Sequence, residues 1–390
     1  WLWQTRAQIG KLQLIPINKK NTMQRCYPLF LILLFAISSC TETPDKATTE
    51  TAALANVDAV DSAACVMASN INVHCGFSNP EDLVIVPSGD ALLVSEMGEF
   101  RIHPPGALAF LNLKSGLREP IEINWQTEER WGDAACPAPD ASLFSPHGID
   151  LTQRADNRHQ LLVVNHGGRE AVEFFELLNI ENEWQVNWKG CAIPPGDPYI
   201  NDVAGLLDGG FLVTHMWDKA LPFETVVEKL LGGEKVGWVY EWQAETGFTM
   251  LPNSIEQMPN GIAVSADNSK IFVNVYIGNK TIRIDRATGI VDGSFEVQQP
   301  DNITVDENGD LWVASHKHDP INQTCTETGV CLLPFEIVKV NPQTLEKTVI
   351  LSHNGAPMGY STVALKVGDS VYMGSAHGDR IAQYALDSDD

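Results

Sequence analysis

The chain has 390 residues, of which 44% are hydrophobic and 19% are charged, so it can bury a large apolar core. Its formal net charge is −24. The sequence therefore lacks the basic surface that DNA- and RNA-binding proteins use, and we expect no nucleic-acid partner.

The N-terminal segment has the features of an export signal. Residues 1–22 precede Met23 and resemble upstream translation. Residues 23–39 contain the apolar run LFLILLFAI, which is too short to span a membrane, and end in Ser-Ser before Cys40. This resembles a bacterial lipoprotein signal, so we expect an exported lipoprotein that is lipidated at Cys40, sits in the outer membrane and faces the periplasm or the cell surface. An ordinary signal peptide is the alternative. Residues 40–65 are polar and aperiodic, which predicts a flexible tether.

Six cysteines follow Cys40, and an even number of cysteines in an exported chain favours disulfides. Zinc ligation is the alternative, but the chain has no CxxC pair to support it. The predicted disulfides are Cys325–Cys331, which bracket a short loop, and also Cys65–Cys75 and Cys136–Cys191.

Six stretches of the remaining chain repeat one pattern, in which a short polar start is followed by an apolar run, an Asp/Gly/Asn turn and a second apolar run. The copies are PEDLVIVPSGDALLV from Pro80, PHGIDLTQRADNRHQLLVV from Pro146, INDVAGLLDGGFLV from Ile200, PNGIAVSADNSKIFV from Pro259, PDNITVDENGDLWV from Pro300 and YSTVALKVGDSVYM from Tyr360. Short strands in regular repeats of this length predict an all-β, six-bladed β-propeller over residues 66–390. A two-sheet sandwich is the alternative, but it does not explain six copies in phase.

The second residue of each copy bears a ligand atom or a hydroxyl: Glu81, His147, Asn201, Asn260, Asp301 and Ser361. Equivalent positions of a propeller converge on its axis, so we expect a cage of oxygens around a central tunnel. The predicted ligands of one Ca²⁺ are Glu81, Asn201, Asn260, Asp301 and the adjacent Asn302, because hard oxygen donors in this number suit calcium better than zinc or copper. Turn residues at strand ends are the alternative explanation.

Two carboxylates are predicted to lie deeper in the tunnel. Asp82 and Asp202 each follow a ring ligand by one residue, and buried carboxylates are costly without a cation. We therefore expect a second, structural Ca²⁺ there, which the backbone carbonyl of Ile149 helps to bind. Two exposed aspartates are the alternative.

Two histidines are candidate catalytic residues. His147 opens the second repeat, and His166 follows the second strand of the same repeat in LLVVNH. A histidine beside a metal-bound carbonyl can deprotonate water, and a second histidine can orient the first. A structural role for each histidine is the alternative.

At these residues the chain resembles the paraoxonase/arylesterase family of six-bladed propellers, which is related to the gluconolactonase superfamily. The resemblance runs from about Pro80 to Tyr384. It is carried by Glu81-Asp82, SPHGI from Ser145, LLVVNH from Leu161, Asn201-Asp202, NGI from Asn260, DNI from Asp301, DLWV from Asp310 and STVA from Ser361. The resemblance implies a calcium-dependent lactonase or esterase with the two calcium sites described above and with His147 and His166 as its histidine dyad.

The chain departs from the family pattern in four places. The cleavable signal replaces the family's N-terminal hydrophobic helix. The family's disulfide between the N-terminal region and the last strand cannot form, because the last segment, YALDSDD, contains no cysteine. The segment from His215 to Val236 and the Cys325–Cys331 loop do not align, and we expect both over the mouth of the tunnel. Candidate pocket walls are His215, Trp217, Trp238 and His316.

The predicted function is calcium-dependent hydrolysis of a small-molecule lactone or aryl ester. Calcium polarises the carbonyl, and water activated by His147, with His166 behind it, attacks the carbonyl carbon. Asp301 or Glu81 is the alternative base or nucleophile. A sugar lactonase or a phosphotriesterase-type hydrolase at the same metal is one alternative function, and a non-catalytic binding propeller with structural calcium is the other. The sequence does not indicate an oligomeric state.

Overall fold

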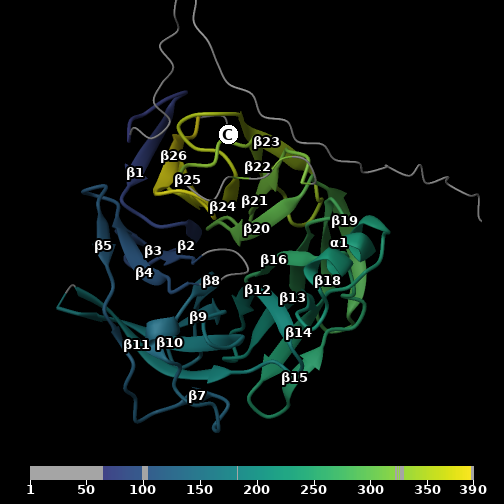
Figure 1. The fold of residues 1–390 in the computed structure, drawn as a ribbon. Coiled ribbons are helices and arrows are strands. Elements are labelled where there is room, and N and C mark those ends of the chain that lie inside the picture. The colour runs from purple at the N-terminus through teal and green to yellow at the C-terminus, as the bar shows by residue number, and fades with distance from the viewer. Residues whose placement is uncertain are drawn as a thin grey trace, which may run out of the picture. The chain divides into compact units, whose positions relative to one another are not determined.

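A computed structural model of the chain has its strands in six sheets that surround a common centre (Figure 1). It describes residues 65–98, 104–181, 183–320, 323, 325 and 329–387. The first strands of the six sheets contact one another in a closed order, β2, β8, β12, β16, β20 and β24. The chain is therefore a six-bladed β-propeller, as predicted, and the polar start of each repeat lies on an innermost strand.

Each blade is an antiparallel sheet whose strands follow one another from the centre outward. Blade 1 consists of β2 (Pro80–Ile85), β3 (Ala91–Glu96), β4 (Ala107–Asn112) and β5 (Arg118–Pro120); blade 2 of β8 (Pro146–Gln153), β9 (His159–Asn165), β10 (Ala171–Ile180) and β11 (Glu183–Ala192); blade 3 of β12 (Pro198–Gly205), β13 (Phe211–Asp218), β14 (Trp238–Gln243) and β15 (Gly247–Met250). Blade 4 consists of β16 (Pro259–Val264), β17 (Lys270–Val275), β18 (Lys280–Asp285) and β19 (Ile290–Glu296); blade 5 of β20 (Pro300–Val305), β21 (Leu311–His316), β22 (Phe335–Val340) and β23 (Lys347–His353); blade 6 of β24 (Ser361–Val367), β25 (Ser370–Ser375), β26 (Arg380–Ala385) and β1 (Ile71–Cys75).

Few elements lie outside this plan. Two short strands, β6 (Ile123–Asn124) and β7 (Trp131–Gly132), pair in parallel with the outer edge of blade 2. A 3-10 helix spans Ala141–Leu143, and α1 (Phe223–Leu231) lies between β13 and β14. No helix among the described residues is both long and apolar enough to cross a membrane.

The ring closes because the N-terminal strand completes the C-terminal blade. β1 pairs antiparallel with β26, so the first strand of the chain becomes the outer strand of the last blade. Cys65–Cys75 ties the segment before β1 to β1 itself. The closure therefore uses backbone pairing and a local disulfide, where the family pattern has a disulfide to the last strand.

The three predicted disulfides, Cys65–Cys75, Cys136–Cys191 and Cys325–Cys331, are all confirmed. The signal segment, Cys40 and most of the tether lie outside the described residues, so the lipid anchor stays a prediction.

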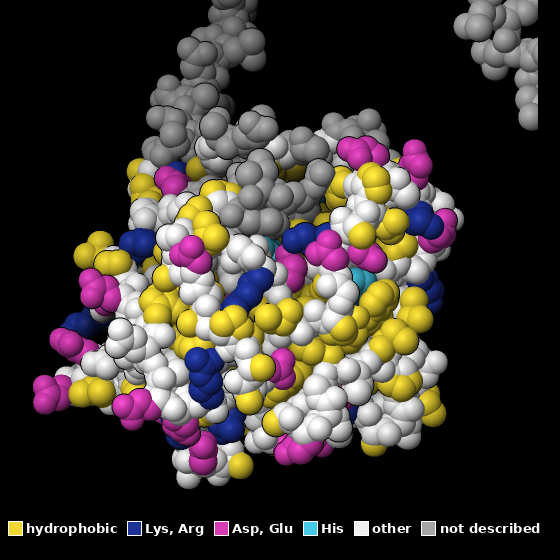
Figure 2. Space-filling view, turned by 60° about the horizontal axis from the view of Figure 1, so that its bottom comes forward, with side chains coloured by type: hydrophobic (Ala, Val, Ile, Leu, Met, Phe, Trp, Pro, Cys, Tyr) yellow, Lys and Arg dark blue, Asp and Glu magenta, His cyan; other side chains and the backbone are white. Residues whose placement is uncertain are grey.

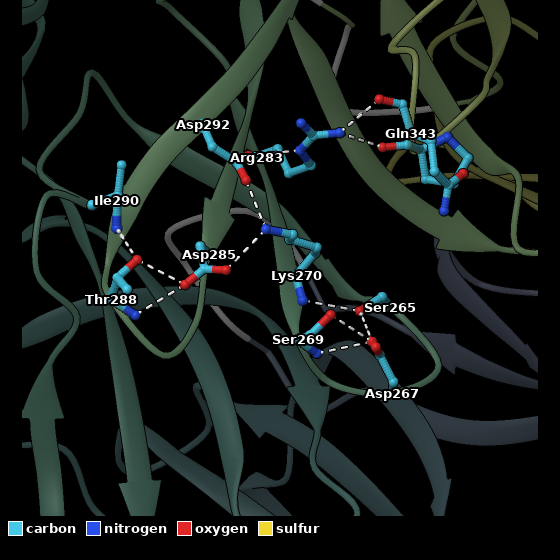
Figure 3. A network of polar contacts seen from close by, with 11 residues as sticks. Ser265, Asp267, Ser269, Lys270, Arg283, Asp285, Thr288, Ile290, Asp292 and Gln343 are labelled. Atoms are coloured by element: carbon cyan, nitrogen blue, oxygen red, sulfur yellow. Dashed lines mark hydrogen bonds and ion pairs between the residues drawn. The ribbon is translucent and has the colours of Figure 1, made fainter.

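Apolar side chains fill the spaces between the blades, and the outer strands carry polar networks. In blade 4, Lys270 Nζ lies 2.9 Å from Asp285 Oδ2 and 2.7 Å from Asp292 Oδ2, and Arg283 reaches the Gln343 carbonyl of blade 5 at 2.9 Å (Figure 3). Asp267 accepts hydrogen bonds from Ser265 and Ser269 within its hairpin, which makes it a turn residue. On the face drawn in Figure 2, Lys and Arg side chains are scattered, some next to Asp and Glu and others among hydrophobic and neutral side chains.

Every innermost strand contains a β-bulge at the polar start of its repeat. In blade 2, Pro146 pairs with Asn165 and Ile149 with Val163. Two residues of β8 therefore lie between these pairs where β9 has only one. The same extra residue occurs in β2, β12, β16, β20 and β24. A bulge breaks the strict alternation of side chains along a strand. Two consecutive residues of one strand can therefore both be directed toward the axis.

Candidate active site

The bulges bring five of the predicted site residues to one cavity of ≈ 350 Å³ at the mouth of the tunnel. Its lining includes Glu81, His147, Asn201, Asn260 and Asp301, one from each of blades 1 to 5. The second residue of the repeat thus lies at the cavity in five copies, as predicted.

The sixth copy was aligned one residue too early. Ser361 pairs with Ser375 as Pro80 pairs with Glu96, so Ser361 corresponds to the residue before the ring position. Its hydroxyl donates to the Val363 carbonyl at 3.0 Å, and Thr362 lines the cavity instead. The repeat begins with Tyr in place of Pro or Ile there, and this difference hid the shift.

Four oxygens at this site have no hydrogen-bond donor although they are buried. They are Glu81 Oε2, Asn201 Oδ1, Asn260 Oδ1 and Asn302 Oδ1, on residues that are between 1% and 4% exposed. Asn302 Nδ2 donates to Glu81 Oε1 at 2.8 Å, which joins blade 5 to blade 1 and orients both side chains. Buried acceptors without a partner are strongly unfavourable. A cation would satisfy all four, and they belong to four of the five predicted ligands.

Asp301, the fifth predicted ligand, is also buried at the cavity. Burial and the nearby Glu81 carboxylate raise the pKa of Asp301 well above its usual value, although a hydrogen bond from Asn260 opposes the shift. Two carboxyl groups held close together in a buried site repel each other when both are ionised. The electrostatics of the ring therefore favour a bound positive charge.

The donor set excludes some metals. Among the described residues, no group of three or more His, Cys, Asp or Glu side chains is placed to hold a metal ion. The ring instead mixes two carboxylates with three amide oxygens. Oxygen donors of this kind suit Ca²⁺, whereas zinc and copper sites use imidazole or thiolate ligands.

Asp82 and Asp202 lie one residue deeper and line a second cavity of ≈ 360 Å³ at the other end of the tunnel. Each bridges two blades: Asp82 Oδ2 accepts from the Ile149 backbone N–H at 2.8 Å, and Asp202 Oδ2 accepts from the Ile262 N–H at 2.7 Å. Burial is the main cause that raises the pKa of both carboxyls well above the usual value. Both aspartates are buried, so the alternative of two exposed aspartates is wrong.

Glycines on two inner strands allow the neighbouring inner strands to approach closely. A Cβ on Gly148 would lie 2.6 Å from Asp202 Oδ1, and a Cβ on Gly261 would lie 2.4 Å from the Asp301 carbonyl oxygen. Any side chain at either position would clash with a neighbouring inner strand. The Gly of the repeated His-Gly-Ile and Asn-Gly-Ile motifs is thus explained by close approach between inner strands.

The two predicted catalytic histidines are in direct contact. His147 Nδ1 lies 2.8 Å from His166 Nε2, and both rings are buried. The other nitrogen of His147, Nε2, lies 3.4 Å from Asn201 Nδ2 and 3.6 Å from Glu81 Oε1. His147 therefore presents Nε2 to the ring of oxygens and Nδ1 to His166.

Sequence reasoning missed a carboxylate behind this pair and misplaced the pocket walls. Glu170 contacts His166, and the spacing of four residues across the β9–β10 turn was its only signal. His215 stacks on Trp238 at 3.8 Å, and Trp217 stacks on Tyr199 at 4.3 Å, inside blade 3. None of His215, Trp217 and Trp238 lines the cavity, so those three predictions were wrong.

His316 also lies outside the cavity lining, on the far side of Asp301. Its Nε2 is 3.5 Å from Asp301 Oδ2, its Nδ1 is 2.9 Å from the Tyr276 hydroxyl, and its ring stacks on Tyr360 at 4.0 Å. Burial lowers the pKa of His316 to about 3. This histidine is therefore neutral at physiological pH and does not supply the positive charge that the ring lacks.

The mouth of the cavity is mainly apolar. Helix α1 contributes Phe223, Val227, Leu230 and Leu231, and neighbouring loops and strands contribute Met97, Met216, Met258 and Ile277. Cys325 lies in the same lining. The segment from His215 to Val236 and the start of the Cys325–Cys331 loop thus reach the mouth, as predicted.

The match to known families covers most of the chain: a family model described as Arylesterase matches residues 56–382. No curated protein sequence matches the chain. A solved gluconolactonase from Xanthomonas campestris has 14% sequence identity and a TM-score of 0.50, over 81% of this chain and 89% of that one. Regucalcin, a calcium-binding protein from Agrobacterium tumefaciens, has 14% identity and a TM-score of 0.46, over 80% and 92%. At such low identity, the gluconolactonase supports the fold alone.

Proposed function

We propose that this chain, which belongs to the arylesterase family, is a calcium-dependent hydrolase of lactones or aryl esters. The observation that carries the proposal is the group of four buried oxygens without donors beside the cavity-facing nitrogen of a histidine pair. A ring of this kind offers a cation site and a base in one cavity. A binding propeller with only structural calcium would need no base at the mouth.

The residues that would hold the catalytic ion are those of the ring: Glu81, Asn201, Asn260, Asp301 and Asn302. A second ion would be held by Asp82 and Asp202. Ile149 presents its backbone N–H to Asp82, so any part of its carbonyl in the deep site stays a prediction. When bound in the ring, calcium supplies a Lewis acid that polarises a carbonyl oxygen and stabilises the charge that develops on it.

His147 is the proposed general base. Its Nε2 faces the cavity, where it accepts a proton from the water that attacks the carbonyl carbon. The new C–O bond forms as the ester C–O bond breaks, and His147 returns the proton to the departing alcohol or phenol oxygen, which in a lactone stays attached to the product. His166 holds the His147 ring in place through Nδ1. Asp301 and Glu81 are the alternative bases, because both carboxylates line the same cavity.

The residues that line the mouth of the cavity indicate the polarity of the substrate. Eight apolar side chains surround the entrance, four of them from α1. A lactone with an alkyl chain or an aryl ester would bury apolar surface against them, whereas a sugar lactone would lose hydration of its hydroxyls there. We therefore favour an apolar substrate over the sugar lactonase or phosphotriesterase alternatives.

Chelation tests the proposal directly. We expect the protein purified in calcium to hydrolyse at least one member of a panel of alkyl lactones and phenyl esters, and EGTA to abolish the activity. Calcium, but not zinc, should restore it. Hydrolysis that is unchanged after complete removal of calcium, or that zinc alone restores, would refute the proposed metal dependence.

Replacing Asp202 tests the deep site through stability. Calcium at 100 times its dissociation constant stabilises the folded protein by about 2.7 kcal/mol, which corresponds to a rise in Tm of about 5 °C. We expect Asp202→Ala to reduce the calcium-induced rise in Tm, because it removes one of the two carboxylates that we assign to the ion. Asp150→Ala is the matched control, since Asp150 also bridges two blades in the same cavity by accepting from the Gly205 N–H at 2.7 Å.

The control should lower Tm but keep the full calcium-induced rise. Equal rises in wild type, Asp202→Ala and Asp150→Ala would rule out a second ion at the deep pair.

A further inference from the structure

Glu170 lies behind the histidine pair, in the turn between β9 and β10. Its Oε2 and Oε1 are 2.9 Å and 3.0 Å from His166 Nδ1. Lys219 Nζ lies 2.7 Å from Oε1, and the backbone N–H of Ile200 donates to Oε2 at 3.4 Å. The carboxyl group is buried, with a side-chain exposure of 6%. The contacts thus form a continuous chain from Lys219 through Glu170 and His166 to His147.

Glu170 is ionised in this arrangement. Burial alone would raise its pKa, but the hydrogen bonds from His166 and Lys219 and the positive charge of Lys219 oppose burial and hold the pKa below its usual value. Burial lowers the pKa of His166, so this ring is neutral at physiological pH. An ionised carboxylate has no proton to donate. The proton between Glu170 and His166 therefore belongs to His166 Nδ1.

This assignment also fixes the positions of the protons on the other ring nitrogens of His166 and His147. A neutral imidazole carries only one N–H, so Nε2 of His166 is an acceptor. The His147 nitrogen 2.8 Å away, Nδ1, must then be the donor. His147 Nε2 is consequently left with its lone pair, and it is the nitrogen that faces the cavity, 3.4 Å from Asn201 Nδ2 and 3.6 Å from Glu81 Oε1.

We propose that Glu170 is a positioning residue which, through His166, holds His147 in the tautomer whose unprotonated Nε2 faces the active-site cavity. This inference rests on the proposed function in so far as it assigns His147 the role of base. The reverse tautomer would direct an N–H into the cavity and leave no acceptor for the proton of water. A histidine oriented by a carboxylate is a common arrangement for a general base, and here a second histidine is interposed.

A purely structural role for Glu170 is the competing explanation, because its contacts with Lys219 and Ile200 join blade 2 to blade 3. The variant Glu170→Gln keeps the size of the side chain and separates the two explanations. The Gln oxygen should stay with Lys219, which makes the shortest contact with Oε1. The amide nitrogen then lies where Oε2 was, 2.9 Å from His166 Nδ1, and donates to it. Both histidines should adopt the reverse tautomer, because the neutral Gln oxygen at the Oε1 position, 3.0 Å from Nδ1, is a weaker acceptor than a carboxylate and is already bound by Lys219.

The tautomers can be measured without substrate, in protein loaded with calcium. In ¹⁵N-histidine-labelled protein, protonated and unprotonated ring nitrogens differ strongly in chemical shift, and His147→Gln and His166→Gln assign the signals. We expect protonated Nδ1 on both rings in wild type and protonated Nε2 on both in Glu170→Gln. Tautomers that are the same in wild type and Glu170→Gln would overturn the inference, whatever the activity.

Kinetics measure what the positioning contributes. We expect Glu170→Gln to lower kcat about 10²-fold with little change in KM, as for a base held in the wrong tautomer, because Glu170 does not line the cavity. The matched control is Glu176→Gln on β10, a buried carboxylate that pairs with Arg158 and Lys189 away from the site. It should retain wild-type kcat even if its Tm falls.

A second substitution distinguishes positioning from blade attachment most sharply. In the double variant Glu170→Gln/Lys219→Met, the ammonium group that bound the Gln oxygen is gone. The Ile200 N–H then favours the amide orientation that puts the Gln oxygen at the Oε2 position, next to His166 Nδ1. We expect part of the lost kcat to return, whereas a structural role predicts further loss. If wild type hydrolyses substrate and Glu170→Gln matches it, the inference fails and the proposed function stands. If wild type hydrolyses no lactone or ester, the proposed function fails and the tautomers still decide the inference.

Discussion

Replacing Asp301 by Asn should lower kcat/KM for a lactone or aryl ester by about 10³-fold or more, a loss of about 4 kcal/mol of transition-state stabilisation. The substitution keeps the shape of the side chain and removes one of only two carboxylates at the ring. Asp301 is buried beside Glu81, and its other neighbours at the ring are amides and the neutral His316. With its charge removed, the ring would retain one carboxylate, which is too little to hold a calcium ion tightly.

The same variant should fold. Burial and repulsion already raise the pKa of the Asp301 carboxyl, so a neutral amide relieves an unfavourable charge in the metal-free protein. The measurements are kcat/KM, calcium stoichiometry by elemental analysis, and Tm with and without calcium. Asp267→Asn, in an exposed hairpin, is the matched control and should change none of them. An Asp301→Asn protein that binds one calcium fewer yet hydrolyses normally would show that the ring ion is not catalytic.

The sequence predicted the fold and most of the site because both follow from one repeat. Six copies in phase implied six equivalent blades, and equivalent positions of a closed ring must face its axis. That argument placed Glu81, His147, Asn201, Asn260 and Asp301 in one cavity without any knowledge of side-chain contacts. It needed only the period of the pattern and the polar residue in each copy.

Other features depend on geometry that a repeat does not encode. The position of Asp82 deep in the tunnel was predicted, but the reason for it was not: the extra residue in every inner strand lets Asp82 follow Glu81 toward the axis, and strict alternation would have directed it away. Ser361 was misaligned because a sixth copy without Pro can be shifted by one residue and still fit the pattern. The aromatic pairs of blade 3 were taken for pocket walls because composition alone cannot tell a residue between sheets from one at a mouth.

Glu170 was missed for a related reason. It is one of several Glu residues around β10, and the others make ion pairs away from the cavity, such as Glu173 with Arg169 and Glu176 with Arg158. Only the fold shows that Glu170 alone of these reaches His166. A role that passes through one side chain to another is not visible in a linear pattern.

Replacing His147 by Gln should lower kcat about 10²–10⁴-fold, the usual range for loss of a general base. Gln approximates the reach of the imidazole and can hydrogen-bond to Asn201 and His166, but it cannot accept a proton at neutral pH. KM and calcium affinity should change little, because the ring oxygens that we assign to the ion remain. His166→Gln should have a smaller effect of the same kind, since His166 touches the cavity only through His147.

His159→Gln provides the matched control, because His159 begins the strand β9 that leads to His166 but lies at the end away from the cavity. It should retain wild-type kcat, so a loss in His147→Gln could not be assigned to a disturbed blade 2. Near-normal turnover in His147→Gln would transfer the role of base to Asp301 or Glu81, the two carboxylates that share the cavity. In that case the effect of Asp301→Asn would combine the loss of a metal ligand with the loss of a base. The two variants together therefore decide whether the charge of the ring and the proton acceptor are separate groups in this enzyme, as the contacts of His147 indicate.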